Sequence, residues 1–111
     1  MKIKTILIIL AGLLIGCSDF NTEPVITSLT ADNTTVSPGG TVLLTCTAED
    51  DNDDSLTYNW ECTSGRLISN GSTATWTAPG SPGTYSISCA VTDGNDGSTM
   101  EIIDITVLTI L

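Results

Sequence analysis

The sequence contains no histidine, and only 3 of its 111 residues are Lys or Arg. Histidine is the commonest general base, a frequent partner of Ser and Cys nucleophiles and a usual zinc ligand, so these arrangements are excluded. The chain also lacks a Gly-Lys-Ser/Thr phosphate loop and the G-x-S-x-G turn of hydrolases. These absences predict a protein without catalytic activity.

Positive charge is almost confined to the first four residues. Lys2 and Lys4 lie there and Arg66 is the only other basic residue, whereas the chain has 13 Asp and Glu. Nucleic acids and anionic lipid headgroups are bound by clustered Lys and Arg, which residues 17–111 do not have. The composition therefore argues against a nucleic-acid partner. The simplest interpretation of the acidic residues is solvated surface charge.

Long apolar runs are also absent. The longest, residues 5–15, is well short of the roughly 20 residues that a membrane-spanning helix requires. Because it follows Lys2 and Lys4, it has the composition of a secretory leader instead. The residues after this leader are enough for one immunoglobulin-type sandwich and too few for two domains.

Leu14-Ile15-Gly16-Cys17 resembles the lipobox of bacterial lipoprotein signal peptides. The resemblance implies that residues 1–16 are removed, that Cys17 carries the lipid, and that residues 17–23 form a short tether. Three acyl chains, as the resemblance implies, hold a protein stably at a membrane. The expected location is the bacterial cell envelope, outside the cytoplasm. Ser18 favours the outer membrane if the cell has two.

Residues 24–111 alternate in polarity with a period of two and show no helical period. In residues 41–48, for example, Val42, Leu44 and Cys46 share one face. The pattern predicts an all-β, two-sheet antiparallel sandwich of about seven strands, without the helical crossovers that parallel pairing needs. The predicted strands are 25–30, 41–48, 56–63, 66–68, 72–78, 84–92 and 99–108, the first at a sheet edge.

Several segments resemble bacterial immunoglobulin-like domains of the polycystic-kidney-disease-repeat (PKD) kind. They are Val42–Ala48, the acidic loop running into Leu56–Trp60, Trp76–Pro79, and Gly83–Ile87 through Asp93-Gly94. The resemblance covers residues 24–108 and implies an immunoglobulin-like sandwich, a scaffold that hosts many unrelated functions. We expect a membrane-anchored binding or spacer module with an unidentified protein or glycan ligand. The alternative is a structural subunit of an envelope assembly that docks through its last strand.

The same resemblance bears on the cysteines that remain after the leader. Apart from Cys17, three cysteines remain, so at most one pair can form. All three, Cys46, Cys62 and Cys89, lie on predicted inner faces. Cys46 and Cys89 resemble the inter-sheet disulfide of immunoglobulin domains. The tyrosine of that fold stands two residues before the second cysteine, however, whereas Tyr85 stands four before Cys89. A Cys62–Cys89 pair between neighbouring strands therefore stays open.

Both tryptophans lie in phase with the apolar face of their strands. Trp60 and Trp76 are expected to come from opposite sheets and to fill the core, each burying on the order of 150–250 Å². A carbohydrate-binding platform would require exposed rings, so the alternation argues against one.

Two acidic loops offer a candidate metal site. In an immunoglobulin-like fold, the loop after residue 48 and the loop before residue 99 lie at the same end of the sandwich. Calcium prefers six to eight oxygen ligands, and its extracellular sites have dissociation constants of roughly 10⁻⁴–10⁻³ M. The alternative is that these residues are ordinary solvated turn formers. The expected ligands of a weak calcium site are Asp50, Asn52, Asp54, Asp93 and Asp96.

Overall fold

The computed structural model describes residues 22–109 except residue 53. These residues form β-strands and loops, with no helix among them. Within these residues there is no helix capable of crossing a membrane. The predicted leader and Cys17 lie outside the described part. The strands are β1 (Val25–Ala31), β2 (Thr35–Val36), β3 (Thr41–Glu49), β4 (Thr57–Cys62), β5 (Arg66–Asn70), β6 (Thr73–Thr77), β7 (Gly83–Thr92) and β8 (Ser98–Val107).

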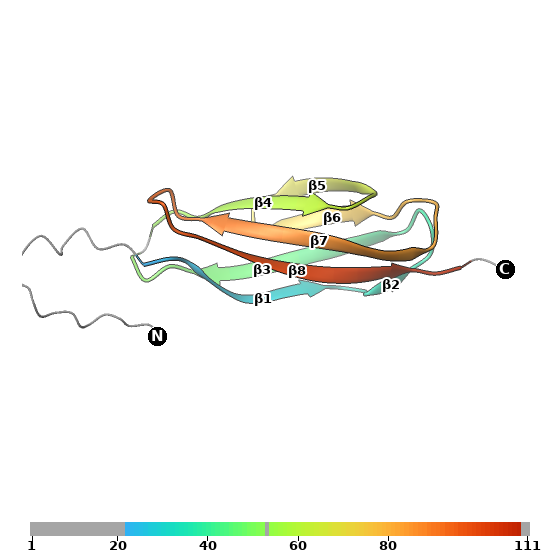
Figure 1. The fold of residues 1–111 in the computed structure, drawn as a ribbon, viewed down its shortest axis with the longest axis horizontal. Helices are drawn as coiled ribbons and strands as arrows, with labels where there is room; N and C mark the ends of the chain where they lie inside the picture. Colours follow the sequence, from blue (N-terminus) through green and yellow to red (C-terminus); the bar gives the residue numbers. More distant parts are fainter. Residues whose placement is uncertain (1–21, 53, 110–111) are drawn as a thin grey trace, which may run out of the picture.

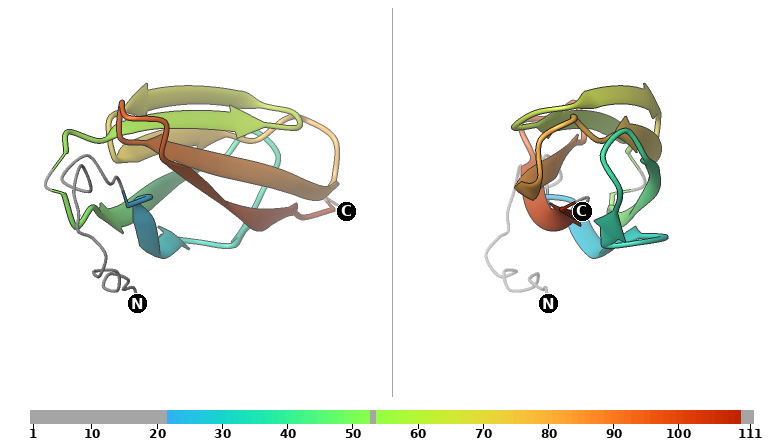
Figure 2. Two further views of the ribbon diagram at one scale, coloured as in Figure 1. Left: turned by 60° about the vertical axis from the view of Figure 1, so that its left-hand side comes forward. Right: turned by 90° about the vertical axis from the view of Figure 1, so that its right-hand side faces the viewer.

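The strands form two four-stranded sheets, ordered β1-β3-β6-β5 and β2-β8-β7-β4. The sheets face each other across one core (Figures 1 and 2). Every pairing is antiparallel except β2 with β8, which is parallel. The predicted all-β, immunoglobulin-like sandwich is therefore confirmed, and β1 occupies a sheet edge as expected.

The sequence pattern did not predict β2. After β1 the chain leaves the first sheet and joins the second, where Thr35 pairs with Thr106 and Val36 with Val107. The Thr106 and Leu108 amides donate to the carbonyls of Thr34 and Val36, at 2.9 and 2.8 Å. Two residues are too few to show a period of two, and only the tertiary contact with β8 defines this strand. The expectation of purely antiparallel pairing was wrong at this one edge.

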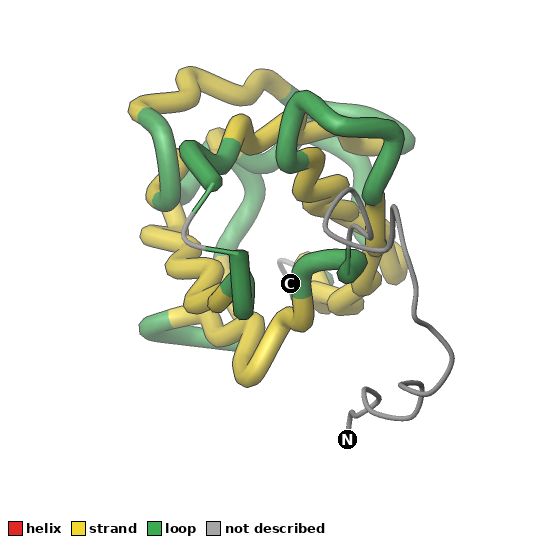
Figure 3. The backbone as a smooth tube through the Cα atoms, turned by 90° about the vertical axis from the view of Figure 1, so that its left-hand side faces the viewer, coloured by secondary structure: helices red, strands yellow, loops and turns green. Residues whose placement is uncertain are grey.

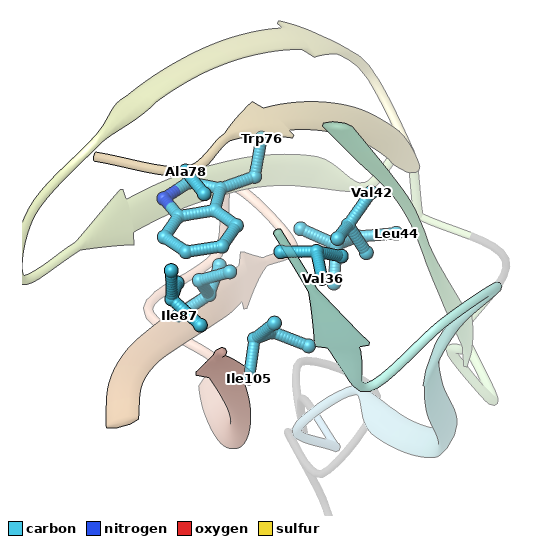
Figure 4. Packing of buried hydrophobic residues seen from close by; sticks show 8 residues of the cluster. Val36, Val42, Leu44, Trp76, Ala78, Ile87 and Ile105 are labelled. Carbon is cyan, nitrogen blue, oxygen red and sulfur yellow. The ribbon is translucent and has the colours of Figure 1, made fainter. Parts of the chain in front are cut away.

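The core follows the alternation of β3, β6, β7 and β8. Trp76 is fully buried, and the buried residues around it include Leu44, Ile87 and Ile105. Figure 4 shows the indole over Ile87. Trp60, from the opposite sheet, is partly buried against the same cluster. Trp76 is therefore in the core, as predicted, and Trp60 packs against the core from the other sheet.

The two ends of the sandwich differ in what they carry. The segment that enters β1, residues 22–24, lies at the same end as the β3–β4 loop (50–56) and the β7–β8 loop (93–97) (Figure 1). The C-terminal end of β8 lies at the opposite end. Any site built from the two acidic loops is therefore next to the entry of the chain into the domain.

We expect Gly65→Ala to destabilise the protein by about 2–4 kcal/mol, because a methyl group there both strains the backbone and displaces a core indole. Gly65 has φ +90°, and an added Cβ would lie 2.6 Å from Nε1 of Trp76 and from the Thr77 carbonyl. The same indole nitrogen donates to the Ser64 carbonyl at 2.8 Å. Urea unfolding followed by tryptophan fluorescence measures the loss.

Gly71→Ala is the matched control. Gly71 has φ +63° with nothing within 4 Å of the added Cβ, so only the backbone strain of about 1–2 kcal/mol applies. Equal losses in the two variants would show that contact with Trp76 does not constrain the β4–β5 turn.

Candidate functional site

Acidic side chains from two loops converge at the end where the chain enters β1. The β3–β4 loop supplies Asp50 and Asp54, and the β7–β8 loop supplies Asp93. One carboxylate oxygen of each lies within 4.8 Å of the other two. Figure 3 looks onto this end. The structure thus brings together three of the five residues predicted to bind a cation, while binding itself stays a prediction.

Backbone amides orient two of these carboxylates. Oδ1 of Asp93 accepts from the amides of Asn95 and Gly97 at 2.8 and 2.9 Å. Oδ1 of Asp50 accepts from the Asn52 amide at 2.7 Å. Such bonds to residues two ahead are the reason that Asp is common in turns. Asp93 is only 3% exposed, so its carboxylate is held firmly at the edge of the core.

The remaining two predicted ligands lie outside this group of three. Oδ1 of Asn52 accepts from the backbone amide of Thr22 at 2.8 Å, so it joins the acidic loop to the entry segment. Asp96 is exposed and has φ +71°. The Thr22 contact could not be predicted from the sequence, because the entry segment has no periodic pattern that places it.

Within residues 22–109, residue 53 apart, no Lys or Arg lies beside the three carboxylates. Two unit charges 4.8 Å apart repel by about 0.9 kcal/mol in water and by about 3.5 kcal/mol at an effective dielectric of 20. Arg66 is the only Lys or Arg in the described residues. In the strand register it lies opposite Thr77 of β6, and Thr77 lies opposite Thr41 at the start of β3. The acidic loop follows the end of that strand, about 30 Å away.

Two oxygens of this group also lack a hydrogen-bond partner. Oδ2 of Asp50 and Oδ2 of Asp54 are buried and accept no hydrogen bond within the part of the chain that the structure describes. Because all the possible metal ligands in this group are oxygen atoms, the group suits a hard cation such as calcium rather than zinc, which favours nitrogen and sulfur ligands.

Cys46 and Cys89 face each other across the sandwich. Cys46 lies on β3 and Cys89 on β7, and both are buried as thiols in one cluster with Val91. Burial raises the pKa of the Cys89 thiol to about 12, and its hydrogen bond with Cys46 acts in the same direction. Burial also raises the pKa of Cys46. The two sulfur atoms are thus adjacent, as an inter-sheet disulfide requires, and the bond itself stays a prediction.

The alternative partner, Cys62, is out of register. In the β4–β7 pairing Trp60 lies opposite Cys89, whereas Cys62 lies opposite Ile87. Diagonal neighbours in a sheet are about 7–8 Å apart, which exceeds the 4.4–6.8 Å between Cα atoms that a disulfide spans. The register therefore disfavours a Cys62–Cys89 bond.

Tyr85 supports the immunoglobulin-like interpretation in spite of its offset. Its hydroxyl donates to the Ser81 carbonyl, four residues upstream, at 2.6 Å. Its ring lies 6.0 Å from that of Trp76. The conserved tyrosine of immunoglobulin domains also donates its hydroxyl to the backbone a few residues upstream. Tyr85 therefore makes the same kind of bond, although its spacing to Cys89 differs.

The outer face of the second sheet carries two exposed apolar side chains. Met100 and Ile102 on β8 are 55% and 57% exposed, and they lie opposite the small residues Ala90 and Ser88 of β7. Beside them is a shallow hollow of about 190 Å³ whose walls include Glu61, Ser88 and Ile102.

Comparison with known families agrees with this geometry. The model of the K319L-like PKD domain matches residues 30–107. The chain belongs to the K319L-like PKD domain family. The match spans all of β2 to β8 and the acidic loops, so the PKD domain includes the three clustered carboxylates. No curated protein matches the chain significantly.

Solved structures similar to the PKD domain include part of an adhesin. The adhesin InvE of Yersinia pseudotuberculosis is similar with a TM-score of 0.54 and 27% identity, over 73% of this chain and 26% of the adhesin. The chain thus spans about a quarter of that protein. A chimeric titin Z1Z2 with a KLER peptide from decorin is less similar, with a TM-score of 0.44 and 14% identity over 78% of this chain and 95% of that one. A PKD fold similar to an adhesin domain is typical of a binding or structural module.

We expect the PKD domain, purified without reductant, to contain a Cys46–Cys89 disulfide and a free Cys62 thiol. The bond should stabilise the fold by about 3–4 kcal/mol. Non-reducing peptide mapping checks the pairing. After reduction, Cys62 should be alkylated faster than the buried pair, because the thiolate is the reacting form and burial disfavours it. A Cys62–Cys89 peptide, or three reactive thiols before reduction, would contradict the assignment.

Proposed function

We propose that this protein is a lipid-anchored module of the bacterial cell envelope, exposed outside the cytoplasm, which binds or spaces other molecules and carries out no catalysis. The family match carries the proposal, because PKD-like sandwiches act as binding and structural units. The similarity to part of an adhesin supports the same class of function. The lipobox-like Leu14–Cys17 supports the anchor.

The arrangement of the domain fits such a module. The entry segment and the C-terminal end of β8 lie at opposite ends of the sandwich (Figure 1). A lipid on Cys17 would hold the acidic end near the membrane, a few residues from Thr22. The far end would then project away from the surface, as a spacer or a displayed binding domain requires.

The anchor is tested by Cys17→Ala. We expect the variant to leave the membrane fraction or to accumulate as a larger precursor, because it has no thiol to receive the lipid and permit cleavage. Cell fractionation with immunoblotting measures both effects, and Cys62→Ala serves as the control that also loses one cysteine. If Cys17→Ala remained in the membrane at the mature size, the anchor would be disproved.

A second candidate function, a structural subunit that docks through β8, is favoured by the exposed Met100 and Ile102. β8 pairs with β7 along its length but with β2 over only two residues, so most of its other edge has no paired strand in the described residues, although β1 packs beside it. The adjoining apolar side chains would add buried area to such a contact.

Met100→Thr/Ile102→Thr distinguishes docking from spacing. Chemical cross-linking in intact cells should yield a stoichiometric partner that this variant loses, because threonine keeps the strand but removes apolar surface. Ile68→Thr is the control, since Ile68 is 64% exposed on β5 of the other sheet. If wild type yielded no partner, or if both variants kept it, docking through β8 would be excluded.

A further inference from the structure

We propose that Asp50, Asp54 and Asp93 bind one calcium ion, and that this ion fixes the entry segment against the sandwich through the bond between Asn52 and Thr22. The proposal concerns the domain itself and does not depend on the lipid anchor. It rests on the converging oxygens, on the two buried oxygens that lack a partner, and on the link between the loop and the entry segment.

The spacing of the oxygens fits calcium. Calcium holds its ligands at 2.3–2.6 Å, so oxygens bound to one ion are at most about 4.6–5.2 Å apart. The three carboxylate oxygens lie within 4.8 Å of one another and can surround one ion with little movement. Magnesium requires near-ideal octahedral ligands at about 2.0–2.1 Å and usually keeps several waters, which suits this group less well.

The buried oxygens provide an observation separate from the clustering. A buried carboxylate oxygen normally has a hydrogen-bond donor, because burying it without one is unfavourable. Oδ2 of Asp50 and of Asp54 have none among the described residues. Nor can Arg66 supply positive charge, since it lies level with the far end of β3. A divalent cation between the two loops would supply both the missing contacts and the missing charge.

The effect on the entry segment follows from the position of Asn52. Asn52 lies between Asp50 and Asp54 in the β3–β4 loop, and its side chain accepts the Thr22 amide at 2.8 Å. An ion bound by Asp50 and Asp54, which flank Asn52 in the sequence, would hold the loop in the conformation that makes this bond. Calcium would therefore set the direction in which residues 22–24 leave the sandwich.

The first test is thermal melting of the purified full-length chain in EDTA, in 10 mM calcium chloride and in magnesium chloride at equal ionic strength. With a dissociation constant of about 10⁻⁴–10⁻³ M, calcium should raise the Tm by roughly 5–15 °C. Asp50→Asn/Asp54→Asn should abolish this rise. In EDTA the same variant should melt above wild type, because it relieves the repulsion between carboxylates.

Glu61→Gln/Glu101→Gln is the control, since it removes two negative charges from strands β4 and β8 and should keep the calcium response. If calcium and magnesium raised the Tm equally, or if both double variants lost the calcium-induced rise equally, charge screening would explain the effect. Identical melts in all three buffers would overturn the ion site.

The second test is amide hydrogen exchange of the peptide that contains Thr22. Calcium should slow its exchange in wild type, whereas Asn52→Ala should keep the calcium-induced rise in Tm and lose the protection of Thr22. The Asn52 backbone amide that bonds Asp50 is unchanged in this variant. If calcium raised the Tm without protecting Thr22 in wild type, the link to the entry segment would be refuted while the ion site stood.

Discussion

Burial of the Trp76 indole between the sheets is the interaction on which the rest of the structure depends. A buried indole contributes a large apolar area, but its N–H must find an acceptor. That acceptor is the Ser64 carbonyl in the β4–β5 turn, and the turn approaches the ring so closely that residue 65 must be glycine. One side chain therefore fixes the core and also the connection by which the chain crosses from the second sheet to the first.

Because this core is built from alternating residues, the sequence predicts most of it. Strands β3 to β8 lie within two residues of their expected bounds, since each has enough residues to show which face is apolar. β2 was missed for the opposite reason, since two residues carry no period. The cysteine alternatives illustrate a further limit. Alternation places Cys46, Cys62 and Cys89 inside, but only the β4–β7 register shows that Cys62 lies opposite Ile87.

The acidic end was predictable in outline and not in detail. The topology of the fold puts the two loops at one end, so the proximity of the loops that carry Asp50, Asp54 and Asp93 follows from the strand order. The position of Asp96 outside the group and the contact of Asn52 with Thr22, 30 residues earlier, could not be predicted. Neither has a local signal, because both are set by how the loops fold over the end of the finished sandwich.

The fold is shared by many proteins with different tasks, so what is specific to this one lies where local rules are broken. Most of the chain is consistent, with apolar residues inside and turns of Gly, Asn and Asp. Two places are not. Among the described residues, two buried carboxylate oxygens at the acidic end have no hydrogen-bond donor, and two large apolar side chains are exposed side by side on β8. Neither feature helps the isolated domain, since the first adds repulsion and the second leaves apolar area in water. A cation bound at the first place, as proposed, and an apolar partner bound at the second would each remove that cost. These two places therefore carry more information about function than the sandwich that holds them.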